Sequence, residues 1–199
     1  AILDDTSKSM DAILLDATAA DTVRPAGLLE GVTPTASAGA TAADIITDLK
    51  ALLATFTTDD ASKNVVILIN PQRVLGLATA TNTVGEMMFA AQVAQGNIMG
   101  IPLIQSANVA TDEVHMVNSG EFATAYDGPR FSVSNTATLH MEQDQADVKE
   151  IVDGAVTPVT ADPVRSLFQT DSIGIRTIFP VTWTLRRDDS VSSLSGVAW

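Results

Sequence analysis

Val65-Val-Ile-Leu-Ile-Asn-Pro71 is the stretch around which the fold can be assigned. Its first five residues are apolar and largely β-branched, which predicts a short buried strand over residues 65–69. The strand ends at Asn70, whose side chain can cap a helix, and Pro71 suits the first helical turn. The sequence therefore predicts a buried strand that leads directly into a helix over residues 71–80.

An amphipathic helix is predicted just before this strand, over residues 42–56. One apolar stripe at helical spacing defines it, made of Ile45, Ile46, Leu49, Leu52, Leu53 and Phe56. Thr41, with Asp44 three residues later, resembles a capping box at its start. Two further helices are predicted over residues 4–18 and 85–94, so helices occupy much of the first half of the chain.

The second half of the sequence has the pattern of strands. Short strands are predicted over residues 101–105, 114–117 and 131–134, and residues 173–187 predict one long strand. Apolar residues alternate along it at Ile173, Ile175, Phe179, Val181, Trp183 and Leu185. Pro180 cannot donate a ladder hydrogen bond, so we expect this strand to be bulged or to lie at a sheet edge. Helices followed by several strands indicate an α+β fold.

The composition favours a protein that associates with copies of itself. Only 18% of the 199 residues are charged, compared with about 25% in typical globular domains, so part of the surface is expected to be covered. The 24 acidic and 11 basic residues give a net charge of −13. This charge disfavours nucleic-acid phosphates and anionic membranes. With no cysteine, the chain fits a reducing cytoplasm.

Motifs that carry chemistry are missing, so we predict no enzyme, no cofactor and no metal site. His115 and His140 lack metal-ligand spacing and are interpreted as structural or exposed. The acidic residues of 142–153 lack the spacing of a calcium loop; they are Glu142, Asp144, Asp147, Glu150 and Asp153. An alternative hypothesis is an α/β ligand-binding or enzyme domain with a site near Asn70, at the end of strand 65–69.

Three residues are candidates for contacts between subunits. Arg186 and Arg187 end the long predicted strand, and guanidinium groups bind carboxylates in a bidentate manner. Trp199 is the third candidate, because it could anchor to a neighbouring subunit. A solvated charge cluster is the competing interpretation of the arginine pair. A tail or fibre component is the competing assembly protein, although the chain has none of the β repeats that fibres usually carry.

The order of segments resembles the major capsid protein of tailed bacteriophages with the Hong Kong 97-type fold, especially those encoded beside or fused to a prohead protease. Gly27-Leu-Leu-Glu-Gly31 is similar to the turn that follows the long spine helix of that family. Residues 42–71 resemble its helix, strand and Asn-Pro helix start. Residues 96–130 and 168–199 are similar to its later strands, and the four stretches together cover nearly the whole chain.

The resemblance implies an axial domain, residues 31–127 with 188–199, and a peripheral domain, residues 1–30 with 128–187. It also implies that an N-terminal arm, an extended hairpin and the start of the spine helix would precede Ala1, so we expect either that these segments were removed or that this is a trimmed form. The implied function is a structural subunit that forms pentamers and hexamers of a phage head around the genome. Scaffold, prohead protease and portal are the further implied partners, with assembly in the host cytoplasm.

Overall fold

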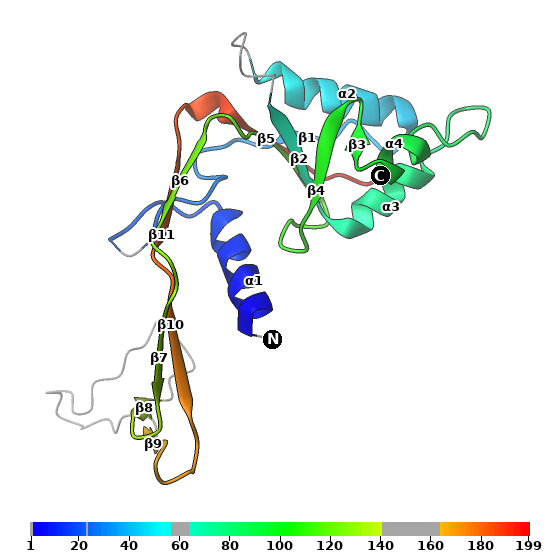
Figure 1. Ribbon diagram of the computed structural model, residues 1–199. Coiled ribbons are helices and arrows are strands. Elements are labelled where there is room, and N and C mark those ends of the chain that lie inside the picture. The colour runs from blue at the N-terminus through cyan, green and yellow to red at the C-terminus, as the bar shows by residue number, and fades with distance from the viewer. Residues whose placement is uncertain (1, 23, 57–63, 141–163) are drawn as a thin grey trace, which may run out of the picture. The chain divides into compact units, whose positions relative to one another are not determined.

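The computed structural model describes residues 2–22, 24–56, 64–140 and 164–199. The chain forms two compact units, of which unit 1 is Ala1–Ala125 with Thr182–Trp199 and unit 2 is Tyr126–Val181. Figure 1 shows the helices and strands of both. The axial and peripheral domains stay a prediction, because these units are defined within one chain and not within a shell.

Unit 1 is built on a mixed six-stranded sheet with the strand order β1-β12-β5-β2-β4-β3. β2 lies near its centre, parallel to β4 and antiparallel to β5. The strands are β1 (Thr35–Ala36), β2 (Val65–Ile69), β3 (Asn97–Ile98), β4 (Ile101–Gln105), β5 (Glu113–Asn118) and β12 (Val191–Ser195). The predicted buried strand over residues 65–69 is therefore confirmed.

The main hydrophobic core lies against one side of this sheet. Val65, Ile67 and Ile69 of β2 point into it, and three helices also contribute side chains to it. These helices are α2 (Ala42–Ala54), α3 (Pro71–Thr79) and α4 (Ala90–Ala94). The predicted capping box of Thr41 and Asp44 begins α2, and Asn70 caps α3 with Pro71 in its first turn. Local sequence signals thus placed both helix starts correctly.

A second, smaller core lies against the opposite side of β2. The alternate residues Val66 and Leu68 pack there with the buried side chains of Leu28, Val117 and Val191. The end of α1 (Ile2–Leu14) and the loop that follows it supply further apolar side chains. The two faces of one strand are therefore buried by segments that precede and follow it in the chain.

Unit 2 contains an antiparallel ribbon of β7 (Arg130–Ser134) and β10 (Gly174–Ile178), in which Val133 is paired with Ile175. A second ribbon joins β8 (Thr138–His140) to β9 (Val164–Ser166). β6 (Phe122–Tyr126) pairs with β11 (Val181–Leu185) and continues from one unit into the other.

The single long strand predicted over residues 173–187 is wrong, because the structure has two strands there, β10 and β11. Pro180 lies between them and lacks the N–H that a continuous ladder would need. Its carbonyl oxygen accepts a hydrogen bond from the main-chain N–H of Asp127 at 3.0 Å. Each of the two strands has one ladder partner, so the expected edge position of this segment is confirmed.

Two predicted helices are shorter than expected. The helix predicted over residues 85–94 begins only at Ala90, because Asn82 organises a turn before it. The Asn82 side-chain oxygen accepts hydrogen bonds from the main-chain N–H groups of Val84 and Glu86, and this turn competes with helix formation. Similarly, α1 ends at Leu14 instead of residue 18, because Asp16 bonds to the turn that follows.

Candidate functional site

A cleft of about 810 Å³ lies in unit 1 between the loop after α1 and strands β11 and β12. Its lining includes residues 25–28 and 30–33 from the loop, and residues 191–193 from the start of β12. Four consecutive residues of β11, Thr182 to Leu185, also line it. Successive side chains of a strand point to opposite faces, so this strand presents its edge to the cleft.

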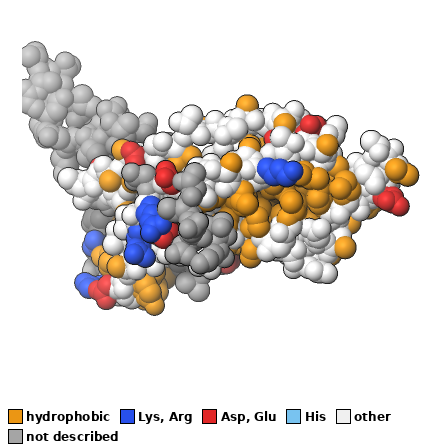
Figure 2. Space-filling model, turned by 90° about the horizontal axis from the view of Figure 1, so that it is seen from above, with side chains coloured by type: hydrophobic (Ala, Val, Ile, Leu, Met, Phe, Trp, Pro, Cys, Tyr) orange, Lys and Arg blue, Asp and Glu red, His pale blue; other side chains and the backbone are white. Residues whose placement is uncertain are grey.

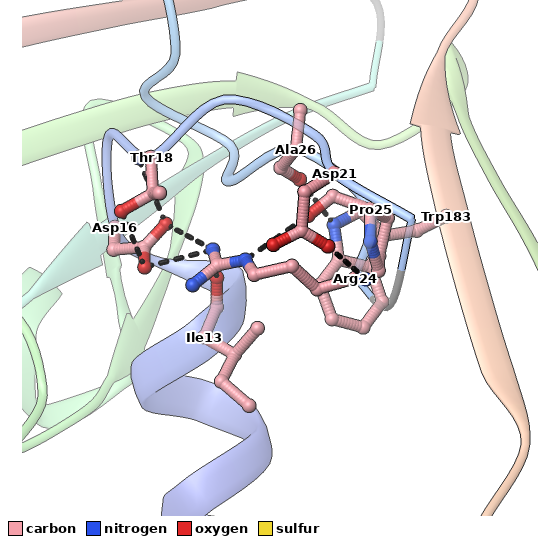
Figure 3. A network of polar contacts seen from close by, with 8 residues as sticks. All are labelled: Ile13, Asp16, Thr18, Asp21, Arg24, Pro25, Ala26 and Trp183. Carbon is pink, nitrogen blue, oxygen red and sulfur yellow. Dashed lines mark hydrogen bonds and ion pairs between the residues drawn. The ribbon is translucent and has the colours of Figure 1, made fainter. Parts of the chain in front are cut away.

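A polar network holds one wall of the cleft in place (Figure 3). The Arg24 guanidinium donates to both carboxylate oxygens of Asp16, at 2.7 and 2.8 Å. Thr18 also donates to Asp16, through its main-chain N–H and its hydroxyl. Burial raises the pKa of Asp16, but these hydrogen bonds outweigh it and hold that pKa below its ordinary value. The turn is thereby tied to the end of α1.

The same wall is joined to β11 through Trp183, whose indole N–H donates to the carbonyl oxygen of Ala26 at 2.8 Å. The next residue, Gly27, lies against the main chain of Asp16. A Cβ atom at position 27 would stand 2.1 Å from the Asp16 carbonyl oxygen, which no side chain tolerates. Gly27 therefore allows the close approach that seats Leu28 in the second core.

The described lining of the cleft is rich in hydroxyl groups. Threonine and serine side chains come from both walls, and the charged residues among the described lining are Glu30 and Asp189. No group of His, Cys, Asp or Glu among the described residues could hold a metal ion. The acidic residues of 142–153 lie outside the described residues. The cleft thus offers main-chain groups and hydroxyls, which suit a polypeptide.

Arg186 and Arg187 follow directly after β11, and both approach Glu121 of the same chain. Each Nε lies 3.9 Å from Glu121 Oε2, an oxygen that is buried without a hydrogen-bond partner. The two arginine side chains are 67% and 50% exposed. Two guanidiniums that share one carboxylate can still bind a further anion. The sequence did not indicate Glu121, because its position depends on the register of β6 against β11.

Trp199, the third candidate contact residue, is only 5% exposed and packs in the main core. Its indole N–H donates to Asp48 Oδ2 at 2.9 Å. Asp48 also accepts hydrogen bonds from the Ser37 hydroxyl at 2.6 Å and the Ala38 N–H at 2.7 Å. Asp48 is itself 2% exposed, although it is not a member of the apolar stripe of its helix.

His115 is a buried structural histidine, as the sequence indicated. It is 1% exposed, and its Nδ1 lies 3.0 Å from Ser193 Oγ on the adjacent strand. Burial lowers its pKa from 6.5 to about 4. Its Nε2 lies 3.4 Å from Glu113, where burial, assisted by Asp112, raises the carboxyl pKa. The side chain of His140 lies outside the described residues.

The low pKa of His115 predicts a loss of stability in mild acid. Below about pH 6.5 the unfolded chain gains a proton that the folded chain accepts only near pH 4, so folding weakens across that window. The loss is about 2 kcal/mol between pH 7 and pH 4.5. Glu113 acts in the opposite direction, because its raised pKa favours the folded state as the pH falls. Urea unfolding at both pH values should show a flatter pH dependence for His115→Gln, and an unchanged slope would contradict the assignment.

The alternative site near Asn70 is not supported by the geometry. The Asn70 side chain is 7% exposed and donates to the Val109 carbonyl oxygen at 2.8 Å. Its oxygen caps α3 through the main-chain N–H of Gln72. Both ends of the amide are therefore used for folding. Among the described helices, none has the length and apolar character to cross a bilayer.

Comparisons with known proteins show the family and the fold. The model of the phage capsid family matches residues 2–194. A capsid polyprotein of Pseudomonas phage PAJU2 is 30% identical over an alignment of 185 residues, and the match covers 89% of this chain and 26% of that protein. The chain thus spans about a quarter of the length of that relative.

Solved structures are similar over nearly the whole chain at low identity. A structure from Gordonia phage Cozz has a TM-score of 0.62 at 13% identity and covers 99% of this chain and 61% of its own. The capsid of an empty GTA particle has a TM-score of 0.62 at 15% identity, and the match covers 99% of this chain and 64% of that one. A structure from Mycobacterium phage Cain has a TM-score of 0.62 at 11% identity, and the match covers 96% of this chain and 61% of that one. The chain belongs to the phage capsid family, and its α+β fold is the Hong Kong 97-type capsid fold.

Proposed function

We propose that this chain is the shell-forming part of a phage major capsid protein, which self-assembles into pentamers and hexamers that enclose the genome. The observation that carries the proposal is the family match over residues 2–194 on a chain with the capsid fold. The protein acts as a structural component of the virion and catalyses no reaction. It is assembled in the host cytoplasm, and scaffold, prohead protease and portal are its further partners.

The apolar surface of the described residues supports self-association. Val133 and Ile175 are cross-strand partners on the β7/β10 ribbon, and they are 69% and 56% exposed. Phe131, two residues before Val133 and therefore on the same face, is 59% exposed. A two-stranded ribbon is marginally stable alone, and exposed apolar patches mark interfaces. This ribbon is expected to be covered in the assembled shell.

Unit 1 also exposes apolar side chains. Figure 2 shows hydrophobic side chains gathered over a broad area of this unit, with few charged side chains among them. Leu53 of α2 and Met99 beside β4 are 38% and 51% exposed. The low charge content of the chain thus corresponds to surfaces that a neighbouring subunit can bury.

Arg186 and Arg187 form an ion-pair contact with a neighbouring subunit in this proposal. Both are at least half exposed, and among the described residues both approach the carboxylate of Glu121. Trp199 has little surface to offer a neighbour, because its side chain is buried in the core. The net charge of −13 keeps the inner surface from adhering to packaged DNA.

Electron microscopy of the full-length gene product, expressed in bacteria and negatively stained, tests the proposal. Closed shells or hexameric rings are the expected result. Uniform small particles at high protein concentration would contradict it.

Reversing the charge of the arginine pair is expected to weaken assembly. In Arg186→Glu/Arg187→Glu, carboxylates replace the guanidiniums that meet the neighbour's carboxylates, so the protein concentration needed for assembly should rise at least about tenfold. Light scattering against concentration measures this value. Lys8→Glu/Lys50→Glu changes the net charge equally and is the matched control. Equal effects of the two double variants would mean that net charge, and not this contact, is responsible.

A further inference from the structure

We propose that Asp127 is a site of spontaneous isomerisation, at which the main chain of the folded protein changes from an aspartyl to an isoaspartyl linkage. Asp127 precedes Gly128 and Pro129 in the segment between β6 and β7. The reacting groups belong to adjacent residues, so the reaction needs no ligand, cofactor or neighbouring subunit. The inference is independent of the proposed function, because it concerns the covalent chemistry of the chain itself.

The reaction begins when one main-chain amide attacks the side chain that precedes it. The Gly128 nitrogen bonds to Cγ of the protonated Asp127 carboxyl group and loses its proton, and water leaves, so that a succinimide ring forms. Water then adds to one of the two ring carbonyls and breaks its bond to nitrogen. Cleavage at Cγ restores aspartate, whereas cleavage at the main-chain carbonyl carbon leaves an isoaspartyl linkage with a free α-carboxylate. One water leaves and one returns, so the mass of the chain is unchanged.

The nitrogen of Gly128 is accessible for this attack. Glycine has no Cβ beside its nitrogen, and it permits a wide range of main-chain angles. Gly128 is exposed, and a Cβ built on it would meet no atom within 4 Å. Space is therefore available for the rotation that brings the Gly128 nitrogen to the Asp127 carboxyl carbon.

The main chain is held more firmly before the reacting bond than after it. Residues 127–129 lie between β6 and β7 and belong to neither strand. The Asp127 N–H donates to the Pro180 carbonyl oxygen at 3.0 Å, which fixes the chain on the N-terminal side of the bond. Pro129 has no N–H with which to fix the other side. The described contacts thus leave the Asp127–Gly128 bond the freedom that ring closure requires.

The Asp127 side chain is exposed and weakly held. Its carboxylate forms an ion pair with Arg130, in which the Asp127 and Arg130 side chains are 67% and 69% exposed. Exposed ion pairs contribute about 1 kcal/mol or less, so the carboxyl group can leave this pair readily. Contact with solvent also supplies the proton and the water that the two steps consume.

Asn118, which precedes Ser119, shows how the fold selects between sites. Asparagine before a small residue undergoes the same ring closure, with ammonia leaving in place of water. However, Asn118 is 2% exposed, and its main chain pairs with Val65 at the end of β5. Its side-chain oxygen accepts a hydrogen bond from the Gly120 N–H at 3.0 Å. The sequence offers both sites, and the structure favours reaction at Asp127.

An isoaspartyl linkage adds one carbon atom to the main chain between β6 and β7. Side chains alternate regularly along a strand because each residue contributes the same main-chain length. The added carbon therefore changes the path by which the chain enters β7, and it removes the side-chain carboxylate from its pair with Arg130.

Peptide mapping of the full-length protein, after prolonged incubation at neutral pH, tests the proposal. Tryptic peptides are sequenced by mass spectrometry with electron-transfer fragmentation, which distinguishes the two linkages, and rates are compared in buffer and in guanidinium chloride. The folded protein is expected to react at Asp127 within about tenfold of the rate of the unfolded chain. Asn118 should react at least about 100-fold more slowly when folded, which corresponds to a barrier about 2.7 kcal/mol higher. The other Asp-Gly pair, residues 153–154, lies outside the described residues and falls on a separate peptide.

Gly128→Ala is the matched variant for the reacting nitrogen. A methyl group on residue 128 shields that nitrogen and has space in the fold. Isoaspartate at position 127 should then accumulate at least about tenfold more slowly, a barrier about 1.4 kcal/mol higher, with an unchanged circular dichroism spectrum. Equal rates in this variant and the parent would overturn the proposal. A folded protein that reacts at Asp127 more than about tenfold more slowly than the unfolded chain would also overturn it.

Discussion

Replacement of Trp199 by alanine is expected to destabilise unit 1 by about 4 kcal/mol. The change removes a large aromatic side chain that is 5% exposed in the main core, and such truncations cost about 3–5 kcal/mol. It also leaves the buried Asp48 carboxylate without one of its three hydrogen-bond donors. Urea unfolding followed by circular dichroism measures the difference in unfolding free energy.

Trp199→Phe separates the two contributions to that loss. Phenylalanine keeps an aromatic ring in the core but has no N–H for Asp48, so its cost should be about 1–3 kcal/mol. A loss below about 1 kcal/mol for Trp199→Ala would show that the side chain does not occupy the core. Similar losses for both variants would instead assign the effect to the hydrogen bond.

Replacement of Gly27 by alanine is expected to cost about 3 kcal/mol, although it adds a single methyl group. The new Cβ would overlap the main-chain carbonyl of Asp16, with the two atoms 2.1 Å apart, so the turn must move as a whole. That movement withdraws Leu28 from the second core and breaks the hydrogen bond from its N–H to the Leu14 carbonyl oxygen, which is 2.7 Å long. Overpacking against backbone cannot be relieved by a change of rotamer.

Gly128→Ala is the control for that substitution. A Cβ at this position meets no atom within 4 Å, and the effect on unfolding free energy should stay within about 0.5 kcal/mol. The midpoint of urea unfolding is the measurement for both variants. If Gly27→Ala unfolds at the same urea concentration as Gly128→Ala, the turn is not packed against α1 as described.

Local chemistry made part of the fold predictable from sequence. The run of β-branched residues over 65–69 and the Asn70-Pro71 start of α3 act through neighbours in the chain, so their signals can be read directly. The α+β class and the family resemblance followed from the order of such segments. The break between two strands at Pro180 was harder to predict from the sequence, because proline in a strand is compatible with a bulge, an edge or an end.

The features that were missed depend on residues far apart in the sequence. β12 has the sequence Val-Ser-Ser-Leu-Ser, which gives a weak strand signal, yet it lies inside the sheet between β1 and β5. The sheet tolerates buried serines at Ser192 and Ser193 because their hydroxyl groups form hydrogen bonds. Ser193 pairs with His115, and the Ser192 hydroxyl donates to the Leu52 carbonyl oxygen. The contact of Asp48 with Trp199 could likewise be identified only from the tertiary structure. The same holds for the contact of Glu121 with the arginine pair.

The position of β12 in the sheet has a consequence for protein synthesis. β1 pairs with β12 through Thr35 and Leu194, so the ribosome must make nearly all of the described chain before these two strands can meet. At roughly 5 to 20 residues per second, that interval is on the order of ten seconds. The cleft, which β11 and β12 border, is incomplete on every nascent chain during this time. Any contact that uses this cleft therefore has to wait until β12 of the same copy has been synthesised.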